Sequence, residues 1–164
     1  MTEPNPREVI GGKNPPIEPV TFTVPGKPQG KKTSQTRGAP KGGGKLKGRG
    51  HYTPAKTRAY EAAVGTMASI AMRGREPIDD CVALCLRAVF EIPASWSAAK
   101  RNRAIVGEIL PGVKPDLSNI IKAVEDGMKG IVLTDDARIV DLSHCKKVYG
   151  LAPMVAVTIR DPRA

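Results

Sequence analysis

The sequence predicts an α+β fold, a single domain in which a small mixed β-sheet is packed by helices in the order β-α-β-α-α-β-β. Three observations lead to this prediction. Short runs typical of strands occur near both ends and in the middle of the chain, two segments between them repeat apolar residues at helical spacing, and 164 residues suffice to bury one core without disulfides. We expect residues 1–18, rich in Pro and polar residues, to be a disordered lead-in and residues 19–164 to form the domain.

The first strand and the first helix are expected in the N-terminal half. Residues 20–24 alternate apolar residues with Thr, which predicts a strand that ends at the Pro and Gly of positions 25–26. Thr53 before Pro54 is typical of an N-cap followed by the first helical residue. A helix is then predicted as far as Gly74. Its apolar residues at helical spacing are Tyr60, Ala63, Val64, Met67 and Ile70.

A buried strand and a short helix are expected next. The apolar run from Val82 to Phe90 is bounded by two Asp and a Pro, which predicts a strand inside the sheet. Ser95 or Ser97 then provides the N-cap of a short basic helix that extends through Arg103.

The C-terminal third predicts one helix and two strands. Residues 117–129 have the strongest helical periodicity of the chain, and Gly130 is placed to end this helix. Residues 138–149 and 154–160 are predicted to be strands, joined by a turn at 150–153.

The positive charge is concentrated in one segment. The chain carries 26 Lys and Arg against 16 Asp and Glu, a formal net charge of +10, yet residues 19–60 contain no acidic residue. The ten basic residues of this segment are Lys27, Lys31, Lys32, Arg37, Lys41, Lys45, Lys47, Arg49, Lys56 and Arg58. Such a tract indicates a polyanionic partner, nucleic acid above all, and the alternative is a solvated linker. Its glycine-rich part, residues 38–50, is expected to be a flexible basic loop.

Several functional classes are disfavoured. No apolar run reaches the length of a transmembrane helix, and the N-terminus lacks the apolar core of a secretory signal. The three cysteines have no zinc-ligand spacing, which predicts reduced thiols in a cytoplasmic protein. Gly44-Lys45 resembles part of a phosphate-binding loop, but Leu46 stands where Ser or Thr must hold magnesium, so no nucleotide cofactor is expected.

Acidic residues gather around the predicted helix 117–129. On a helical wheel its apolar arc consists of Leu117, Ile120, Ile121, Val124 and Met128, and its polar arc consists of Ser118, Asn119, Lys122, Glu125 and Asp126. Asp116 precedes the helix, and a short return after Gly130 leads to Asp135 and Asp136. Carboxylates from two elements can hold Mg²⁺ for phosphodiester hydrolysis, with a lysine stabilising the developing charge. The alternative is a solvated helix face and an ordinary Asp-Asp turn, and the residue types alone favour neither.

The run KPDLSNIIKAVEDGMKGIVLTDDARIV resembles the core motif of the RusA-type Holliday junction resolvases, endodeoxyribonucleases common in phages and prophages. The similarity extends over roughly residues 20–160, with flanking motifs at 22–28, 52–61, 93–103 and 146–150. The resemblance implies that Asp116, Lys122 and Asp136 are catalytic, with Asn119 in a supporting role.

One position departs from the family pattern. A second aspartate is expected two residues after the first, but Ser118 stands there, and a hydroxyl is a weaker magnesium ligand than a carboxylate. Either Glu125, Asp126 or Asp135 completes a metal site with Asp116 and Asp136, or metal affinity is lower.

The resemblance implies a Mg²⁺-dependent endonuclease that resolves four-way DNA junctions in recombination and repair. It would act as a homodimer in the cytoplasm of a bacterial host, close to the nucleoid, because paired incision needs two sites related by a two-fold axis. The basic tract would contact phosphates of the junction arms. Two alternatives stay open: a non-catalytic basic nucleic-acid-binding protein, and a Mg²⁺-dependent flap or RNA nuclease.

Overall fold

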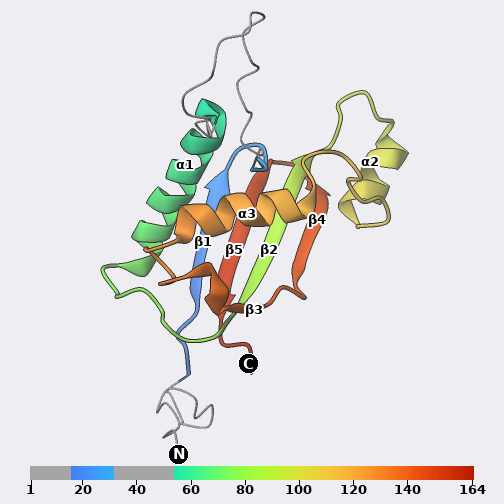
Figure 1. The fold of residues 1–164 in the computed structure, drawn as a ribbon. Coiled ribbons are helices and arrows are strands. Elements are labelled where there is room, and N and C mark those ends of the chain that lie inside the picture. Colours follow the sequence, from blue (N-terminus) through green and yellow to red (C-terminus); the bar gives the residue numbers. More distant parts are fainter. Residues whose placement is uncertain (1–15, 32–53) are drawn as a thin grey trace, which may run out of the picture.

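The central strand of the sheet is β2 (Val82–Glu91). In the computed structural model, which describes residues 16–31 and 54–164, one edge of β2 pairs antiparallel with β5 (Met154–Arg160), which in turn pairs antiparallel with β1 (Val20–Pro25). The other edge of β2 pairs parallel with β3 (Ile139–Asp141) and with β4 (Cys145–Gly150). The predicted α+β fold with a small mixed sheet is confirmed (Figure 1).

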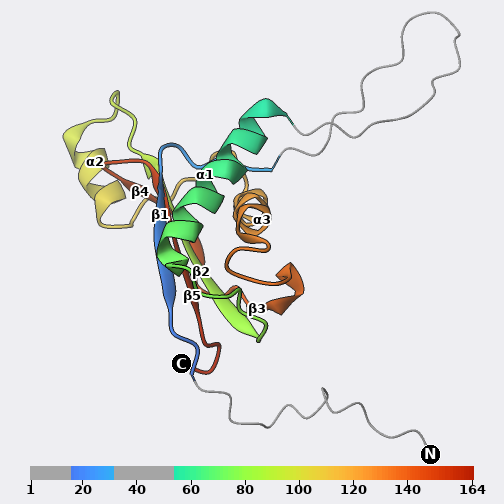
Figure 2. The ribbon, with the colours of Figure 1, turned by 90° about the vertical axis from the view of Figure 1, so that its left-hand side faces the viewer.

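Two helices cover one face of this sheet. α1 (Ala55–Met72) and α3 (Leu117–Met128) lie side by side on the same side of the strands (Figures 1 and 2). Alternating side chains of three strands point toward them and form the main core: Val20, Phe22, Val24, Leu84, Leu86, Ala88, Val155, Val157 and Ile159. Burial of this aliphatic surface is the main stabilising contribution.

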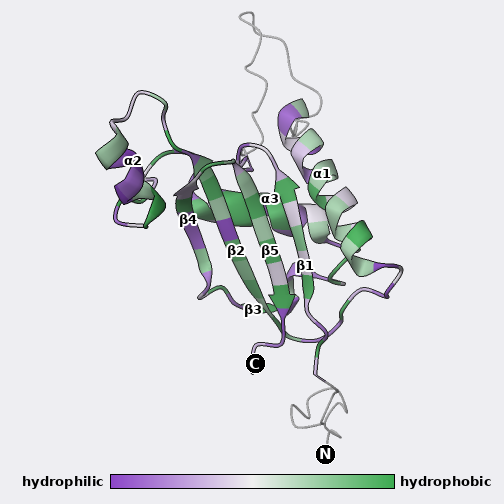
Figure 3. Ribbon diagram, turned by 180° about the vertical axis from the view of Figure 1, so that it is seen from behind, coloured by the Kyte–Doolittle hydropathy of each residue, from purple (hydrophilic) through white to green (hydrophobic). Residues whose placement is uncertain are grey.

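The opposite face of the sheet is not covered by α1 or α3 (Figure 3). Thr21 and Thr158 face each other there across β1 and β5, with their hydroxyl oxygens 3.1 Å apart, and Arg87 of β2 is exposed. The alternation of β1 therefore follows the rule that one face of an antiparallel strand is apolar and the other polar.

The buried face of α1 differs from the predicted one. Of the apolar residues at helical spacing, Tyr60 and Val64 are buried, but Ala63 is exposed and Ile70 is 65% exposed, while Ala68 is buried. The helix begins one residue after Pro54, which is therefore the N-cap, while Thr53 lies outside the described residues. The helix ends at Met72, and the next two residues, Arg73 and Gly74, both have positive φ.

α2 (Ala98–Ile105) lies beyond the end of the sheet (Figure 1). The Ser97 side chain accepts a hydrogen bond from the backbone N–H of Lys100, which decides between the two predicted caps. Trp96 packs edge-on against Tyr149 of β4, with ring centroids 5.2 Å apart, and this contact anchors the helix to the sheet.

The predicted strand 138–149 is interrupted. A 3₁₀ turn (Asp136–Arg138) is followed by β3, and a tight turn separates β3 from β4. In this turn the Asp141 carboxylate accepts a hydrogen bond from the N–H of Ser143 at 2.7 Å. The strand direction is kept across the turn, because β3 and β4 both run parallel to β2. Among the described residues, no helix is long and apolar enough to cross a membrane.

Candidate active site

α3 carries an apolar face and a polar face. Its buried or half-buried apolar residues are Leu117, Ile120, Ile121, Val124 and Met128. On the other face, Lys122 and Asp126 are exposed and Asn119 and Glu125 are half-buried. The helix therefore presents its charged side chains to solvent while its apolar side holds it against the sheet and α1.

Asp116 is the N-cap residue of α3. Its backbone carbonyl accepts hydrogen bonds from the N–H groups of Asn119 and Ile120, each at 3.1 Å. Its side chain makes no capping bond, and the residue is exposed. The carboxylate is thus presented to solvent at the positive end of the helix dipole.

A second group of carboxylates surrounds the C-terminal half of α3. The pKa of Glu125 is raised, first by burial and then by the negative charges of Asp136 and Asp126, while Lys122 acts in the opposite direction. The ion pairs of Lys129, the residue after α3, with Asp135 and Asp136 place this pair beside the C-terminal end of α3.

The chain between α3 and this pair is firmly anchored. Gly130 adopts a positive φ of 74°, and the next two residues donate their N–H groups to the carbonyl of Met128. Val132 and Leu133 are buried, and Ile78 exchanges backbone hydrogen bonds with Val132 and Thr134. The return that carries Asp136 back toward α3 is therefore part of the core.

Lys129, the C-cap residue of α3, lies between the two aspartates. Its ammonium is 3.2 Å from Asp135 Oδ2 and 3.4 Å from Asp136 Oδ1. The pKa of Asp135 is lowered to about 2, first by the N–H of Ala137 and then by hydrogen bonds from the Asp136 and Lys129 side chains. Asp135 is thus held in its charged form next to a lysine cation.

A close crossing of α1 and α3 adds Glu61 to this surface. Gly127 meets Val64 and the carbonyl of Glu61, and a Cβ at position 127 would lie 2.6 Å from Val64 Cβ. The pKa of Glu61 is raised, first by burial and then by Asp126. We call Glu61, Glu125, Asp126, Asp135 and Asp136 the acidic cluster.

Lys31 connects the segment after β1 to this cluster. Its ammonium forms an ion pair with the Asp126 carboxylate, and this contact raises the pKa of Lys31. Its backbone N–H donates to the carbonyl of Asn119 at 2.8 Å. Gly30 is in such close contact with α3 that a Cβ there would lie 2.8 Å from Pro115 Cβ.

The predicted site residues therefore occupy two ends of α3. Ten residues separate Asp116 from Asp126, which corresponds to about 15 Å along the helix axis. Ser118 is exposed near the first end, and Lys122 lies between the two. Asp116 and Asp126 are too far apart in this arrangement to bind the same ion.

Comparison with known proteins places the chain in a family. Residues 25–160 match the family model of the endodeoxyribonuclease RusA, which covers most of the chain. The chain belongs to the RusA family. The match begins at the end of β1 and ends with β5, so it includes Asp116 and the whole acidic cluster. The chain is also similar to the uncharacterized protein YqaN of Bacillus subtilis (strain 168), with 31% identity over 148 residues, 88% of this chain and 98% of that protein. As a member of the RusA family, the protein is an endodeoxyribonuclease, an enzyme that hydrolyses phosphodiester bonds of DNA.

The acidic cluster of this RusA-family protein has donors suited to a hard cation. All its donors are carboxylate oxygens, the ligands that Mg²⁺ prefers. Within residues 16–31 and 54–164, no three Asp, Glu, His or Cys side chains converge closely enough to form a metal site. The ammonium groups of Lys31 and Lys129 are paired with these carboxylates instead. The carboxylate donors therefore fit a divalent cation, which would take the place of the Lys31 and Lys129 ammonium groups beside them.

Four of the predicted DNA-binding residues are described. Lys27, Lys56 and Arg58 are exposed, and Lys31 is half-buried against Asp126. The remaining predicted contacts lie outside the described residues: Lys32, Arg37, Lys41, Lys45, Lys47 and Arg49.

Sequence reasoning did not single out Glu61 or Lys129. Glu61 joins the cluster only because Gly127 allows α1 and α3 to approach closely. A glycine inside a strongly periodic helix is the signal that could have indicated this crossing. Lys129 was not singled out because it lies at the end of the helix, where a helical wheel does not determine the direction of a side chain.

Proposed function

We propose that this protein is a Mg²⁺-dependent resolvase of four-way DNA junctions, which acts as a homodimer in recombination and repair. Its membership of the RusA family supports this proposal. The observation that carries it is the acidic cluster beside exposed lysines on the polar face of α3. In a protein with a formal net charge of +10, such a group of carboxylates would repel DNA phosphates unless a cation is held there.

We assign Asp116 and Asp136 as principal metal ligands. Asp135 and Glu125 are candidates for the position where Ser118 replaces the expected carboxylate. Asp126, the third candidate from the sequence, lies too far along α3 to share an ion with Asp116. Mg²⁺, when bound, would lower the pKa of an attacking water and neutralise charge on the phosphate. Asp136 and Asp135 are accessible for this task because their side chains are about half exposed, and the lowered pKa of Asp135 keeps that carboxylate charged.

We assign Lys122 to charge stabilisation in the transition state. It is exposed on α3 between the two groups of carboxylates, and its cation lowers the pKa of Glu125 relative to the value that burial alone would give. A lysine in this position can donate to a non-bridging phosphate oxygen as negative charge develops. Ser118 and Asn119, one turn or less from Asp116, would support the N-terminal end of the site.

Lys129 and Lys31 must exchange partners during binding. Each is paired with a carboxylate of the acidic cluster, at about half exposure. With a divalent cation on these carboxylates, the ammonium groups of Lys31 and Lys129 would be free to contact DNA phosphates. The basic tract from Lys27 to Arg58 would extend this phosphate contact along the junction arms.

The proposal is tested with a panel of DNA and RNA substrates of matched sequence. A synthetic four-way junction, a linear duplex, a flap and an RNA hairpin are incubated with the protein, with and without Mg²⁺. We expect symmetric cleavage of the junction in Mg²⁺ and little cleavage of the other substrates. Preferential cleavage of the flap or the RNA would support the alternative nuclease, and binding without cleavage would support the non-catalytic alternative.

A further inference from the structure

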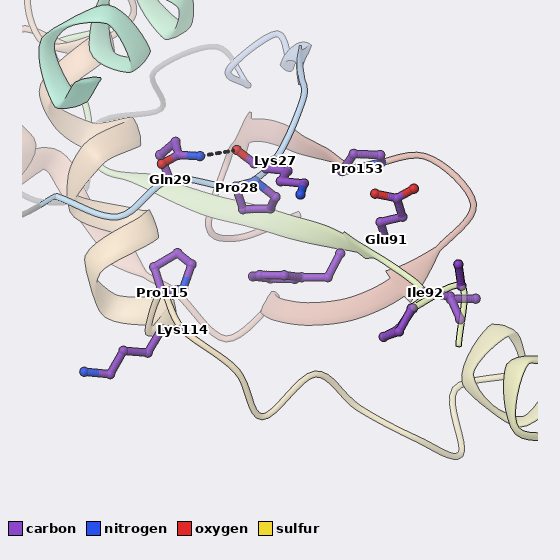
Figure 4. A pocket seen from close by; sticks show the side chains of 11 residues that line it. Lys27, Pro28, Gln29, Glu91, Ile92, Lys114, Pro115 and Pro153 are labelled. Carbon is purple, nitrogen blue, oxygen red and sulfur yellow. Dashed lines mark hydrogen bonds between the residues drawn. The ribbon is translucent and has the colours of Figure 1, made fainter. Parts of the chain in front are cut away.

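A cavity of about 530 Å³ lies between the segment after β1, the end of β2 and the turn before α3. This size is within the range of about 300–1,000 Å³ found for small-molecule sites. The residues that matter for its chemistry are Lys27, Pro28, Phe90, Glu91, Lys114 and Pro115. Figure 4 shows Pro28 and Pro115 on two sides of the same space, with Glu91 at a third side.

The walls of the cavity are held in place by contacts between elements. The N–H of Gly26 donates to the carbonyl of Pro153 at 3.0 Å, which joins the β1 end to the turn before β5. Gly30 packs on Pro115, and the N–H of Lys31 donates to Asn119. The Lys147 ammonium lies 5.0 Å from the centre of the Phe90 ring and donates to the carbonyl of Val113. The cavity is therefore formed before any ligand enters.

The cavity adjoins the N-terminal end of the candidate site. Pro115, one of its walls, immediately precedes Asp116, which we assign as a metal ligand. Lys27 is exposed at the cavity, and Lys114 extends outward from its rim (Figure 4). A phosphate held at this end of α3 would thus have two cations and a preformed cavity beside it.

We propose that the cavity receives the base of one unstacked nucleotide, adjacent to the phosphate that is cleaved. This inference rests on the proposed function and extends it to a nucleotide-binding subsite. The half-buried Phe90 ring and the flat faces of two prolines offer surfaces for a base. The Glu91 carboxylate and the Gln29 amide can hydrogen-bond its edge. Lys27 can contact the phosphate of the same nucleotide.

Binding of the base is tested first without any nuclease reaction. The full-length protein, labelled with ¹⁵N, is titrated with dAMP and, in parallel, with deoxyribose 5-phosphate. We expect dAMP to shift the amide resonances of Gly26, Gln29, Glu91 and Ile92, and the sugar phosphate to leave them nearly unchanged. Equal shifts with both compounds, or shifts elsewhere only, would overturn the inference, because they would show phosphate binding without base recognition.

Phe90 provides the second test. Phe90→Leu removes the ring while keeping an apolar side chain, and we expect the single-turnover rate of junction cleavage to fall about tenfold, the size expected for loss of one base–aromatic stack. Phe90→Tyr keeps the ring and should restore the rate. Phe22→Leu is the matched control, because Phe22 is buried in the main core on β1 and does not line the cavity.

The outcomes separate the two proposals. If the wild type cleaves junctions but Phe90→Leu cleaves at the wild-type rate, the subsite is refuted and the proposed function stands. If Phe22→Leu loses as much rate as Phe90→Leu, the loss reflects stability and the subsite is again refuted. If the wild type cleaves no DNA, the proposed function fails, and the dAMP titration alone decides whether the cavity binds a nucleotide.

Discussion

Gly127 of α3 lies directly against Val64 of α1, so closely that a Cβ on residue 127 would be 2.6 Å from Val64 Cβ and 2.8 Å from the carbonyl oxygen of Glu61. The missing side chain allows the two helices to cross in contact. It also brings Glu61 near Asp126 and thereby adds a carboxylate from α1 to those of α3.

Gly127→Ala should separate the two helices and destabilise the protein. The added methyl group would meet the backbone carbonyl of Glu61, which can shift only if α1 moves. We therefore expect a loss of about 1–3 kcal/mol in unfolding free energy. Chemical denaturation measures this loss. Gly112→Ala is the matched control, because a Cβ at Gly112 meets nothing within 4 Å, and that variant should unfold like the wild type. Equal stability of the two variants would contradict the close crossing.

Lys129→Gln should change the pH dependence of the stability that is linked to Asp135. The pKa of Asp135 is about 2 in the folded protein, below its ordinary value of about 3.9. The stability linked to this carboxylate is therefore fully present above about pH 4 and is lost as pH falls toward 2. Without Lys129 the pKa of Asp135 should rise but stay below its ordinary value, since the N–H of Ala137 is the larger cause. NMR titration of the Asp135 carboxylate in the wild type and in Lys129→Gln measures this pKa.

The same Lys129→Gln variant should need less Mg²⁺ for half-maximal cleavage. The ammonium group competes with a divalent cation for the carboxylates of Asp135 and Asp136. Lys129→Arg keeps the positive charge and serves as the control. A higher Mg²⁺ requirement for Lys129→Gln than for the wild type would show that Lys129 assists the site instead of competing within it.

Ser118→Asp should lower the Mg²⁺ concentration needed for half-maximal cleavage. A charged oxygen at the exposed position 118 adds a hard ligand two residues from Asp116. Ser118→Asn, which adds an amide of similar size without charge, is the matched control. If Glu125 already provides the missing ligand, Ser118→Asp should instead reduce activity, since two like charges then compete at one ion, and Glu125→Gln should be nearly inactive.

Lys122→Ala should lower the cleavage rate by about 10²–10³, the usual cost of removing one donor that stabilises transition-state charge. Lys122 is exposed, so the fold should be retained, which circular dichroism can verify. Lys122→Arg keeps the charge and should recover part of the rate. Full activity of Lys122→Ala would exclude the residue from catalysis.

Local sequence patterns predicted most of the elements, because each has an apolar periodicity of its own. α3 is the clearest case, since its apolar and polar faces match the helical wheel. The interruption between β3 and β4 was missed because it depends on local hydrogen bonds of a turn, from the N–H of Ser143 to Asp141 and from the N–H of Cys145 to the carbonyl of Leu142. The apolar spacing of α1 did not identify its buried face: Ile70 belongs to that spacing but is exposed, because the exact direction of α1 is set by its crossing with α3.

The candidate site was predicted only in part, for a similar reason. The motif from Asp116 to Asp136 is local in sequence, so its residues could be named in advance. The approach of Glu61 and Lys31 depends on contacts between distant segments, such as Gly127 with Val64 and Gly30 with Pro115. The cavity beside Asp116 is built from four separate segments and has no sequence pattern.

Paired incision of a junction tests the central claim most directly. A supercoiled plasmid that extrudes a cruciform is incubated with the wild type or with Asp136→Asn in Mg²⁺, and linear and nicked products are counted. A cut in one strand alone relaxes the plasmid and removes the cruciform, so linear product reports two cuts in one binding event. We predict linear plasmid with the wild type, and binding without any product with Asp136→Asn. Nicked circles alone from the wild type, or linear product from Asp136→Asn, would contradict the account.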